Sequence, residues 1–291
     1  IAEAFPAAAA IFDRANEILG YDLKSLCFEG PQEKLNETVI SQPAIFTTSA
    51  AILEVIRTES ATSGITPDVT AGLSMGEYTA LYAAGLINFE QGVRLVHKRG
   101  TAMQAAADAT EGSMVSIIGL DEEKTQELCD KAAQGQLLKP VNYNCPGQIV
   151  ISGDVEACDR AAEMAEEYGA MKAVVLKVAG AFHTSKMDPA AEDLKKALEE
   201  AEIADITSVK VLANVNAEYY ETPDEIRSGL ASQLVEPILW QKSMEKLLEA
   251  GVEDFYEIGP SKVLTGLMRR INRKTKVKNI SNLKSLEKLL G

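Results

Sequence analysis

The segment from Pro67 to Leu86 constrains the fold of this 291-residue chain more than any other. Residues 67–72 have the character of a short strand, residues 73–75 form a tight turn, and residues 76–86 follow a helical pattern. A strand that turns at once into a helix is typical of α/β proteins. We therefore predict an α/β fold with a parallel sheet in a large domain. Its other elements are expected as helices at 4–19, 43–57, 89–107, 188–200, 223–233, 242–250 and 261–271 and as strands at 209–214 and 253–258.

The pattern changes in the middle of the chain, where short strands alternate with two helices. Their order is strand, helix, strand, strand, helix, strand, which matches the ferredoxin-like motif. The strands are expected at 113–119, 140–144, 148–152 and 173–178, and the helices at 121–133 and 155–168. We predict a ferredoxin-like subdomain at residues 111–179, inserted in a large α/β-hydrolase-like domain formed by residues 1–110 and 180–291.

Composition excludes several classes of partner. The net charge of −14 argues against nucleic acid, because binding to phosphates needs a basic surface. No apolar run approaches the length of a membrane-spanning helix and no signal peptide is found, so we expect a cytoplasmic protein without a membrane partner. The four cysteines show no CxxC spacing and the two histidines lie far apart, which argues against a zinc site and against disulfides. We expect a monomer that carries no cofactor.

The turn after the first predicted strand carries a chemical signal. Its sequence, Gly72-Leu73-Ser74-Met75-Gly76, fits the nucleophile elbow G-x-S-x-G and lies between a predicted strand and a predicted helix. Two glycines let the backbone bend so that the serine hydroxyl projects, and the N–H groups at the start of the helix favour a developing oxyanion. An ordinary turn serine would fit the same five residues, but the flanking strand and helix favour a nucleophile.

A serine nucleophile needs a base, and the chain has only two histidines. His97 lies in a helical stretch, whereas His183 lies in a loop after a predicted strand, where functional side chains concentrate. Position alone therefore favours His183 as the partner of Ser74.

Further motifs follow the serine segment along almost the whole chain. After the run from Gly72 to Leu81 come, in order, Arg99-Gly100 with Met103-Gln104, Asn142 to Gln148, Gly180 to His183, Gln233-Leu234 with Pro237 and Trp240, and Glu257 to Pro260 with Lys262-Val263-Leu264. In content and order these six motifs resemble the malonyl-CoA:acyl-carrier-protein transacylases of bacterial fatty-acid synthesis and the acyltransferase domains of polyketide synthases.

The resemblance implies catalytic roles for four matching residues. Ser74 would be acylated, and His183 would act first as base and then as acid. The backbone N–H of Met75 would contribute to the oxyanion hole. The backbone carbonyl of Gln233, in place of a carboxylate, would orient the imidazole.

The resemblance also implies a set of substrate-binding residues. Arg99 would grip the free carboxylate of a malonyl group, which an acetyl group lacks, with two parallel donors. Phe182 would fill the space of an α-methyl group and favour malonyl over methylmalonyl, a preference worth only about 1–3 kcal/mol. Met103 would line the same pocket, and Asn144 completes the set.

We therefore predict an acyltransferase of fatty-acid synthesis that moves malonyl from malonyl-CoA to the phosphopantetheine thiol of acyl carrier protein, in a ping-pong reaction through malonyl-serine. The basic stretch from Lys262 to Lys288 is a candidate docking surface for the acidic carrier. The alternatives are a trans-acting acyltransferase of a polyketide synthase, a serine acyl hydrolase, which has no use for Arg99, and a non-catalytic homologue that only binds carrier protein.

The sequence departs from the family pattern at two places. Leu73 stands before the serine, where many members have histidine. The family's first strand and its Gly-Gln-Gly-Ser-Gln loop, whose first glutamine contributes to the oxyanion hole, have no counterpart here, and the sequence opens on Ile1. We expect the given sequence to be incomplete at its N-terminus, so that this half of the oxyanion hole lies outside it.

Overall fold

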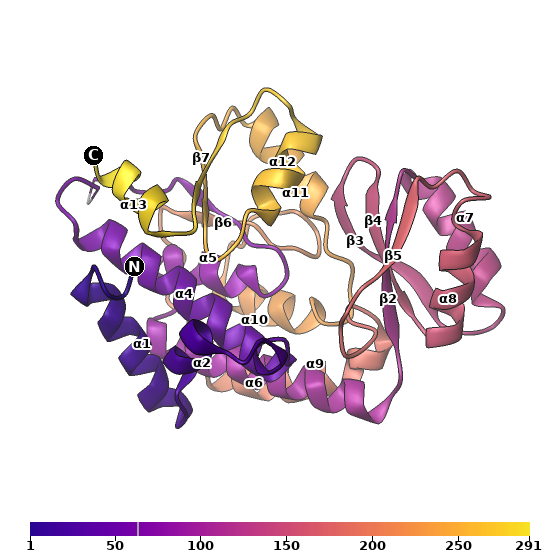
Figure 1. Cartoon of the computed structure of the whole chain (residues 1–291), viewed down its shortest axis with the longest axis horizontal. Coiled ribbons are helices and arrows are strands. Elements are labelled where there is room, and N and C mark those ends of the chain that lie inside the picture. Colours follow the sequence, from indigo (N-terminus) through magenta and orange to yellow (C-terminus); the bar gives the residue numbers. More distant parts are fainter. Residues whose placement is uncertain (63) are drawn as a thin grey trace.

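The structure is a computed structural model that describes residues 1–62 and 64–291, and in this part of the chain it contains three small sheets (Figure 1). Two are parallel pairs, β1 (Val69–Thr70) with β6 (Lys210–Val211) and β7 (Phe255–Ile258) with β8 (Val277–Ile280). The third is antiparallel and consists of β2 (Ser113–Ile118), β3 (Leu138–Cys145), β4 (Gln148–Gly153) and β5 (Lys172–Val175). The fold is therefore mixed α/β.

The parallel strands around the elbow are shorter than the sequence pattern predicts. The strands expected at 67–72 and 209–214 shrink to two residues each in β1 and β6. The side chain of Asn214 is the reason: its Nδ2 donates to the carbonyl oxygen of Gly72 at 2.7 Å, and its Oδ1 accepts from the N–H of Ser74 at 2.6 Å. A side chain thus replaces the backbone ladder, and among the described residues the parallel strands form two separate pairs.

Helices surround these pairs. Their bounds are α1 (Pro6–Leu19), α2 (Leu23–Glu29), α3 (Gln32–Leu35), α4 (Thr38–Thr58), α5 (Gly76–Ala83), α6 (Phe89–Ala109), α9 (Asp188–Glu200), α10 (Pro223–Ser232), α11 (Trp240–Glu249), α12 (Val263–Ile271) and α13 (Leu283–Leu290). Among the described residues, the helices α2, α3 and α13 and the strand β8 have no counterpart in the elements predicted from the sequence. Because α2 and α3 have seven and four residues, they are too short to show a helical period.

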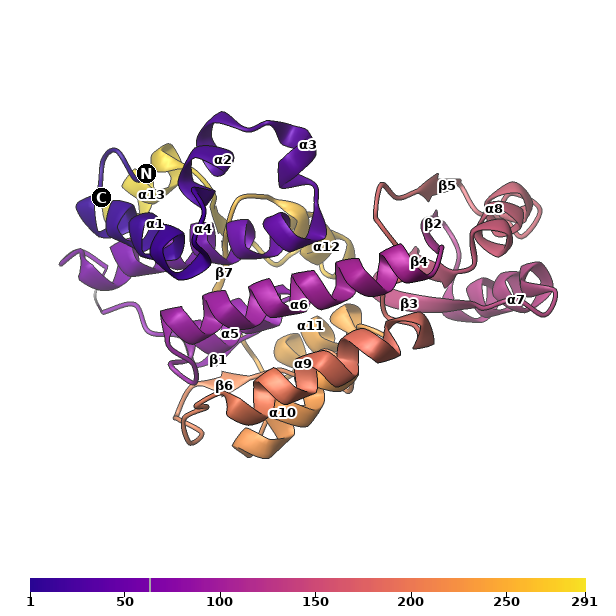
Figure 2. The same cartoon turned by 90° about the horizontal axis from the view of Figure 1, so that it is seen from below.

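The apolar helix α4 lies in the core. It packs along α6 and against α1 (Figure 2), and Gly92 of α6 permits this approach, since an added Cβ there would lie 2.1 Å from the ring of Phe46. Among the described residues, α4 is the one helix long and apolar enough to cross a membrane, so the prediction that no apolar run reaches that length is wrong. Its apolar window is 67% buried inside the protein, and this packing accounts for its composition.

The antiparallel sheet lies at one end of the molecule, where α7 (Glu122–Ala133) and α8 (Val155–Met164) cover one of its faces (Figure 1). Its strand order is β3-β4-β2-β5. Val115 and Ile151 of the sheet pack with Leu128 of α7 and Ala157 of α8 in a hydrophobic cluster. The predicted order of these elements is confirmed, while the domain boundaries stay predictions.

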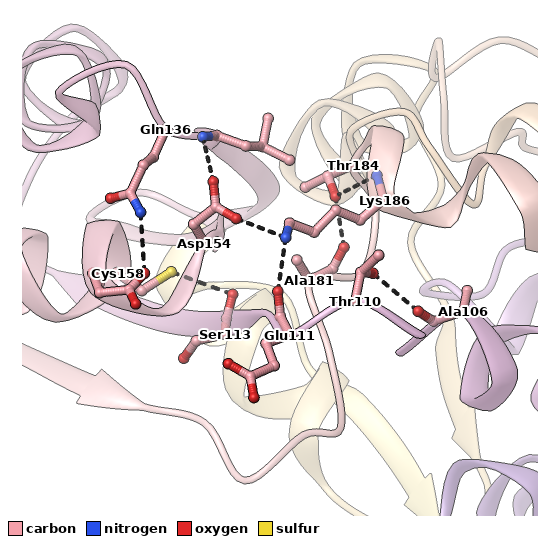
Figure 3. A network of polar contacts seen from close by, with 12 residues as sticks. Ala106, Thr110, Glu111, Ser113, Gln136, Asp154, Cys158, Ala181, Thr184 and Lys186 are labelled. Atoms are coloured by element: carbon pink, nitrogen blue, oxygen red, sulfur yellow. Dashed lines mark hydrogen bonds and ion pairs between the residues drawn. The ribbon is translucent and has the colours of Figure 1, made fainter. Parts of the chain in front are cut away.

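A lysine joins this sheet to the segment that follows it. Lys186, in the short 3-10 helix Ser185–Met187, lies 2.6 Å from Asp154 Oδ1 and donates to the carbonyl oxygen of Glu111 at 2.7 Å (Figure 3). The side chains of Lys186 and Asp154 are only 18% and 25% exposed, which strengthens the pair relative to one on the open surface. The lysine therefore ties the loop that carries His183 to the end of the sheet where β2 begins and β4 ends.

Candidate active site

Ser74 occupies a strained turn between β1 and α5. Its φ of +52° lies in the left-handed region, which residues other than glycine rarely adopt. The turn is so sharp that a Cβ added to Gly72 would lie 2.0 Å from the backbone of Gly76. Asn214 bonds the carbonyl oxygen of Gly72 before this turn and the N–H of Ser74 at its apex, as described above, and holds the turn in place. The elbow predicted from the sequence is therefore present, with the serine at its apex.

Of the two elbow glycines, only Gly72 lies where a larger residue would clash. A Cβ added to Gly76 would have nothing within 4 Å beyond its own helix and chain neighbours, so the prediction that both glycines are required is wrong at Gly76. Position 76 begins α5 and faces open space, whereas position 72 faces the backbone.

This difference predicts unequal effects of two alanine substitutions. Gly72→Ala is expected to slow the labelling of Ser74 by a fluorophosphonate probe about 10–100-fold, because a displacement of the nucleophile of about 1 Å is enough for such a loss. Gly76→Ala, the matched control, is expected to stay within about twofold of the unmodified protein. Equal labelling rates for the two variants would contradict the steric argument.

The base predicted from loop position lies next to the serine. His183 Nε2 is 3.1 Å from Ser74 Oγ, and His183 Nδ1 is 2.7 Å from the carbonyl oxygen of Gln233. Because a carbonyl oxygen only accepts, Nδ1 carries the proton and Nε2 presents its lone pair to the serine hydroxyl. The histidine is 4% exposed and also has a left-handed φ, +62°. The serine hydroxyl, the imidazole and the carbonyl oxygen are thus aligned in the way that a nucleophile and its base require.

Burial keeps this histidine neutral. Desolvation, with the positive charge of nearby Arg99 as a second cause, lowers the pKa of His183 to about 3. A histidine with that pKa is unprotonated throughout the neutral range, so its Nε2 is available as a base.

Arg99 lies beside the same serine and is 1% exposed. Its Nη1 donates to Gln42 Oε1 at 2.9 Å, and its Nη2 donates to Ser74 Oγ at 3.0 Å and to Gln233 Oε1 at 2.8 Å. All three acceptors are neutral, and within the described residues the Nε has no hydrogen-bond partner. Burial lowers the pKa of Arg99 from its usual value, but an arginine remains charged. A buried guanidinium bonded only to neutral oxygens is suited to accept an anionic group.

The other predicted site residues differ in how they are connected to Ser74, His183 and Arg99. Met103 is buried, and its Sδ is 3.5 Å from Nε2 of Gln42. The same Gln42 accepts a hydrogen bond from Arg99. Phe182 packs against two hydrophobic clusters beside His183. Met75 is the N-cap residue of α5. Asn144 lies in β3 with a buried Oδ1 that has no hydrogen-bond partner among the described residues, and no hydrogen bond joins it to the serine or the arginine there.

Three contact residues are absent from the sequence-based predictions: Gln42, Glu77 and Asn214. Gln42 lies just before the helix predicted at 43–57, so the sequence offers no signal for it. Glu77 and Asn214 are buried polar residues in a predicted helix and at the end of a predicted strand, and a polar residue at a position expected to be buried is the signal that could have found them.

Basic residues line a groove away from the serine. Arg269, Arg270 and Arg273 border it from α12 and its C-terminal end, and the loops of the antiparallel sheet border it from the other side. Met171, on that opposite side, is 84% exposed. A positive groove with an exposed apolar side chain is suited to an acidic protein surface.

The sequence matches the family model described as acyl transferase domain over residues 2–289. It is 45% identical over 286 residues to the malonyl CoA-acyl carrier protein transacylase of Bacillus subtilis (strain 168), covering 98% of this chain and 89% of that protein. It is 43% identical over 275 residues to the protein of the same name from Escherichia coli (strain K12), covering 93% of this chain and 86% of that protein.

Solved structures match nearly the whole chain as well. The malonyl CoA-acyl carrier protein transacylase of Coxiella burnetii has a TM-score of 0.94 and 38% identity, and the match covers 99% of this chain and 90% of that one. A complex of a type II polyketide-synthase acyl-carrier protein with its malonyl-transacylase contains a chain with a TM-score of 0.93 and 40% identity, covering 99% of this chain and 92% of that one. The likeness therefore includes both the elbow region and the antiparallel sheet.

Proposed function

This chain belongs to the acyl transferase family and, within it, to the malonyl CoA-acyl carrier protein transacylases, and we propose that Ser74, His183 and Arg99 carry its activity. The protein is an acyl-carrier-protein S-malonyltransferase of fatty-acid synthesis. The observation that supports the residue assignment is the unbroken series of contacts from buried Arg99 through Ser74 to His183 and the carbonyl of Gln233.

In the first half-reaction, His183 Nε2 takes the proton of the Ser74 hydroxyl while Oγ bonds to the thioester carbonyl carbon. The carbonyl of Gln233 stabilises the imidazolium that forms, through the bond to Nδ1–H. The N–H of Met75 and the positive end of α5 stabilise the oxyanion. The carbon–sulfur bond then breaks, and the leaving thiolate of coenzyme A takes the proton from His183.

The second half-reaction reverses these roles. The phosphopantetheine thiol of the carrier gives its proton to His183 and attacks the malonyl carbonyl, and Ser74 Oγ leaves and regains a proton from the same nitrogen. Transfer, as opposed to hydrolysis, requires that water be kept from the acyl-serine, and the burial of His183 and Arg99 serves this purpose.

Arg99 would select the substrate by its carboxylate. Its Nη2 donates to Ser74 Oγ and to Gln233 Oε1. A malonyl carboxylate would take over the guanidinium donors as a bidentate partner, which frees the lone pair of Ser74 Oγ that accepts from Arg99 while the hydroxyl keeps donating to His183. Binding of the correct acyl group would thereby activate the nucleophile.

The remaining predicted residues would shape the acyl pocket. We propose that Met103 packs against the malonyl methylene and that the Oδ1 of Asn144, which has no hydrogen-bond partner among the described residues, accepts from an amide N–H of the pantetheine arm. The ring of Phe182 would occupy the space of an α-methyl group, which favours malonyl over methylmalonyl by about 1–3 kcal/mol.

We also propose the finer description of the fold. The strand order β3-β4-β2-β5 with two helices on one face supports a ferredoxin-like subdomain at residues 111–179. The elbow between β1 and α5 supports an α/β-hydrolase-like domain made of residues 1–110 and 180–291. A monomer in the cytoplasm is the form that we propose for the enzyme.

The residue assignment is tested by mass spectrometry of the intact protein after mixing with malonyl-CoA. We expect a malonyl adduct that persists in the absence of carrier, that is absent from Ser74→Ala, and that disappears when holo-carrier is added. Release of free malonate without carrier would support a hydrolase, and a wild-type protein without any adduct would support a non-catalytic homologue.

The basic groove provides a prediction about the carrier. Reversing the charge of Arg269, Arg270 and Arg273 to glutamate is expected to raise the KM for acyl carrier protein about tenfold at low salt, because an acidic partner then meets like charge. The difference should shrink at high salt, where exposed charges are screened. Arg14→Glu, on the exposed face of α1, is the control. An unchanged KM at low salt would remove this groove as the docking surface.

A further inference from the structure

Glu77 is a fully buried carboxylate in the first turn of α5, three residues after the nucleophile. Its Oε2 accepts from Gln233 Nε2 at 2.6 Å and from the N–H of Asn214 at 3.3 Å, and its Oε1 accepts from the hydroxyl of Tyr220. A carboxylate with 0% exposure and three donors is a built feature of the site, because an unpaired buried charge is costly. The catalytic steps above make no use of it.

Two of the three donors also contact the reacting residues. Besides Glu77, the Gln233 side-chain amide donates to the carbonyl oxygen of Ser74 at 3.0 Å, and its Oε1 accepts from Arg99 at 2.8 Å. Asn214 accepts from the N–H of Ser74. Glu77 therefore holds the Gln233 amide and the backbone of Asn214, the two residues whose side chains bond the backbone of Ser74.

The Gln233 amide also stands between two opposite charges. Its oxygen faces the guanidinium of Arg99 and its nitrogen faces the carboxylate of Glu77. A buried cation needs a compensating charge, but a carboxylate in direct contact would occupy the donors that a malonyl group requires. The Gln233 amide between them preserves the attraction between Arg99 and Glu77 and leaves guanidinium donors available to the substrate.

We infer that Glu77 is a positioning residue whose carboxylate fixes the Gln233 amide and balances the charge of Arg99 across it, so that the buried cation is compensated while its donors stay open to the substrate's carboxylate. This inference rests on the proposed role of Arg99. It assigns a specificity function to a residue that touches neither the substrate nor the reacting atoms.

The charge of Glu77 changes within the neutral range. Burial raises the pKa of Glu77 to about 7, against the opposing effects of its three donors and of Arg99. The other titratable groups facing it do not change protonation state in this range. Burial raises the pKa of Tyr78 on α5 and of Tyr220 after β6, so both stay neutral. His183, on the other side of Gln233, stays unprotonated because its pKa is lowered to about 3. Glu77 is thus the group in this cluster that gains a proton as the pH falls below about 7.

This sets the direction of the pH dependence. Below about pH 7, protonation of Glu77 removes the negative charge that compensates Arg99. It also weakens the hydrogen bond that Glu77 accepts from Nε2 of Gln233. With a pKa of about 7 the ionised fraction falls about tenfold between pH 8 and pH 6, and kcat/KM for malonyl-serine formation should fall with it. Protonation of His183, with a pKa of about 3, does not contribute in this range.

The test measures the rate of malonyl-serine formation by rapid quench at limiting malonyl-CoA, from pH 6 to pH 8. Wild type should lose about tenfold toward pH 6. Glu77→Gln, which keeps the shape without the charge, should be about tenfold slower at pH 8 and nearly flat with pH. The same variant reveals any dependence that comes from ionisation of the substrate.

A second pair of variants covers the case in which Glu77→Gln does not fold. Tyr220→Phe removes a donor that lowers the pKa of Glu77, so its acid limb should move to higher pH, while Tyr219→Phe, the partly exposed neighbour, should leave the limb in place. Three results would overturn the inference and leave the proposed function intact. The first is a wild-type rate of malonyl-serine formation that does not depend on pH. The others are a fall in rate toward low pH that persists in Glu77→Gln, or one whose midpoint does not move in Tyr220→Phe. Failure of wild type to form malonyl-serine at pH 8 would instead overturn the proposed function.

Discussion

His183→Ala is expected to slow malonyl-serine formation about 10³–10⁴-fold, the upper part of the range for loss of a general base. Without the imidazole the serine hydroxyl has no acceptor for its proton: the other group at hydrogen-bond distance is Nη2 of Arg99, which only donates. The loss should appear in kcat more than in KM, because the contacts of Arg99 remain. Single-turnover quench with malonyl-CoA measures it.

The other histidine is the control. His97 lies half-buried on α6, with its ring 6.3 Å from that of Tyr21, and burial lowers its pKa as well. His97→Ala removes an imidazole and some packing but no group of the site, so acylation should stay within about twofold. If both variants lost the same amount of activity, His183 would have no special role, and the assignment of the base would be wrong.

The sequence predicts the elbow well because that signal is local. A strand, five turn residues and a helix are adjacent in the chain, and β1, Ser74 and α5 follow in that order in the structure. The opposition of Ser74 and His183 could be anticipated because only one histidine lies in a loop. Local patterning and a short inventory of bases are enough for this part of the site.

The residues that the sequence does not predict act over long separations. Asn214 contacts Ser74 across 140 positions, and Gln42 contacts Arg99 across 57. No periodicity connects such pairs, because packing of α4, α6 and the β6 region brings them together. The same packing explains the two-residue strands: once the Asn214 side chain satisfies the backbone at Gly72 and Ser74, a longer ladder is unnecessary. Tertiary contacts here override local strand character.

Arg99→Ala is expected to lower kcat/KM for malonyl-CoA about 10²–10³-fold, since removing one partner of a buried charge pair costs about 2–5 kcal/mol and each 1.4 kcal/mol is tenfold. The cost arises because the malonyl carboxylate would enter a buried site without a cation. Acetyl-CoA has no such carboxylate, so its slow transfer should not fall in parallel. The ratio of the two rates therefore measures the selectivity that Arg99 supplies.

Two controls separate this selectivity from general damage. Arg94→Ala, five residues earlier on α6, removes an exposed cation paired with Glu90 and should leave the ratio unchanged. Arg99→Lys keeps a charge but loses the planar pair of donors, so it should recover only part of the malonyl rate. A parallel loss of malonyl and acetyl transfer in Arg99→Ala would mean that the guanidinium only supports the fold around Ser74. A loss confined to malonyl would place the choice of acyl group in one buried side chain, whose positive charge is balanced by the carboxylate of Glu77 on the far side of an amide.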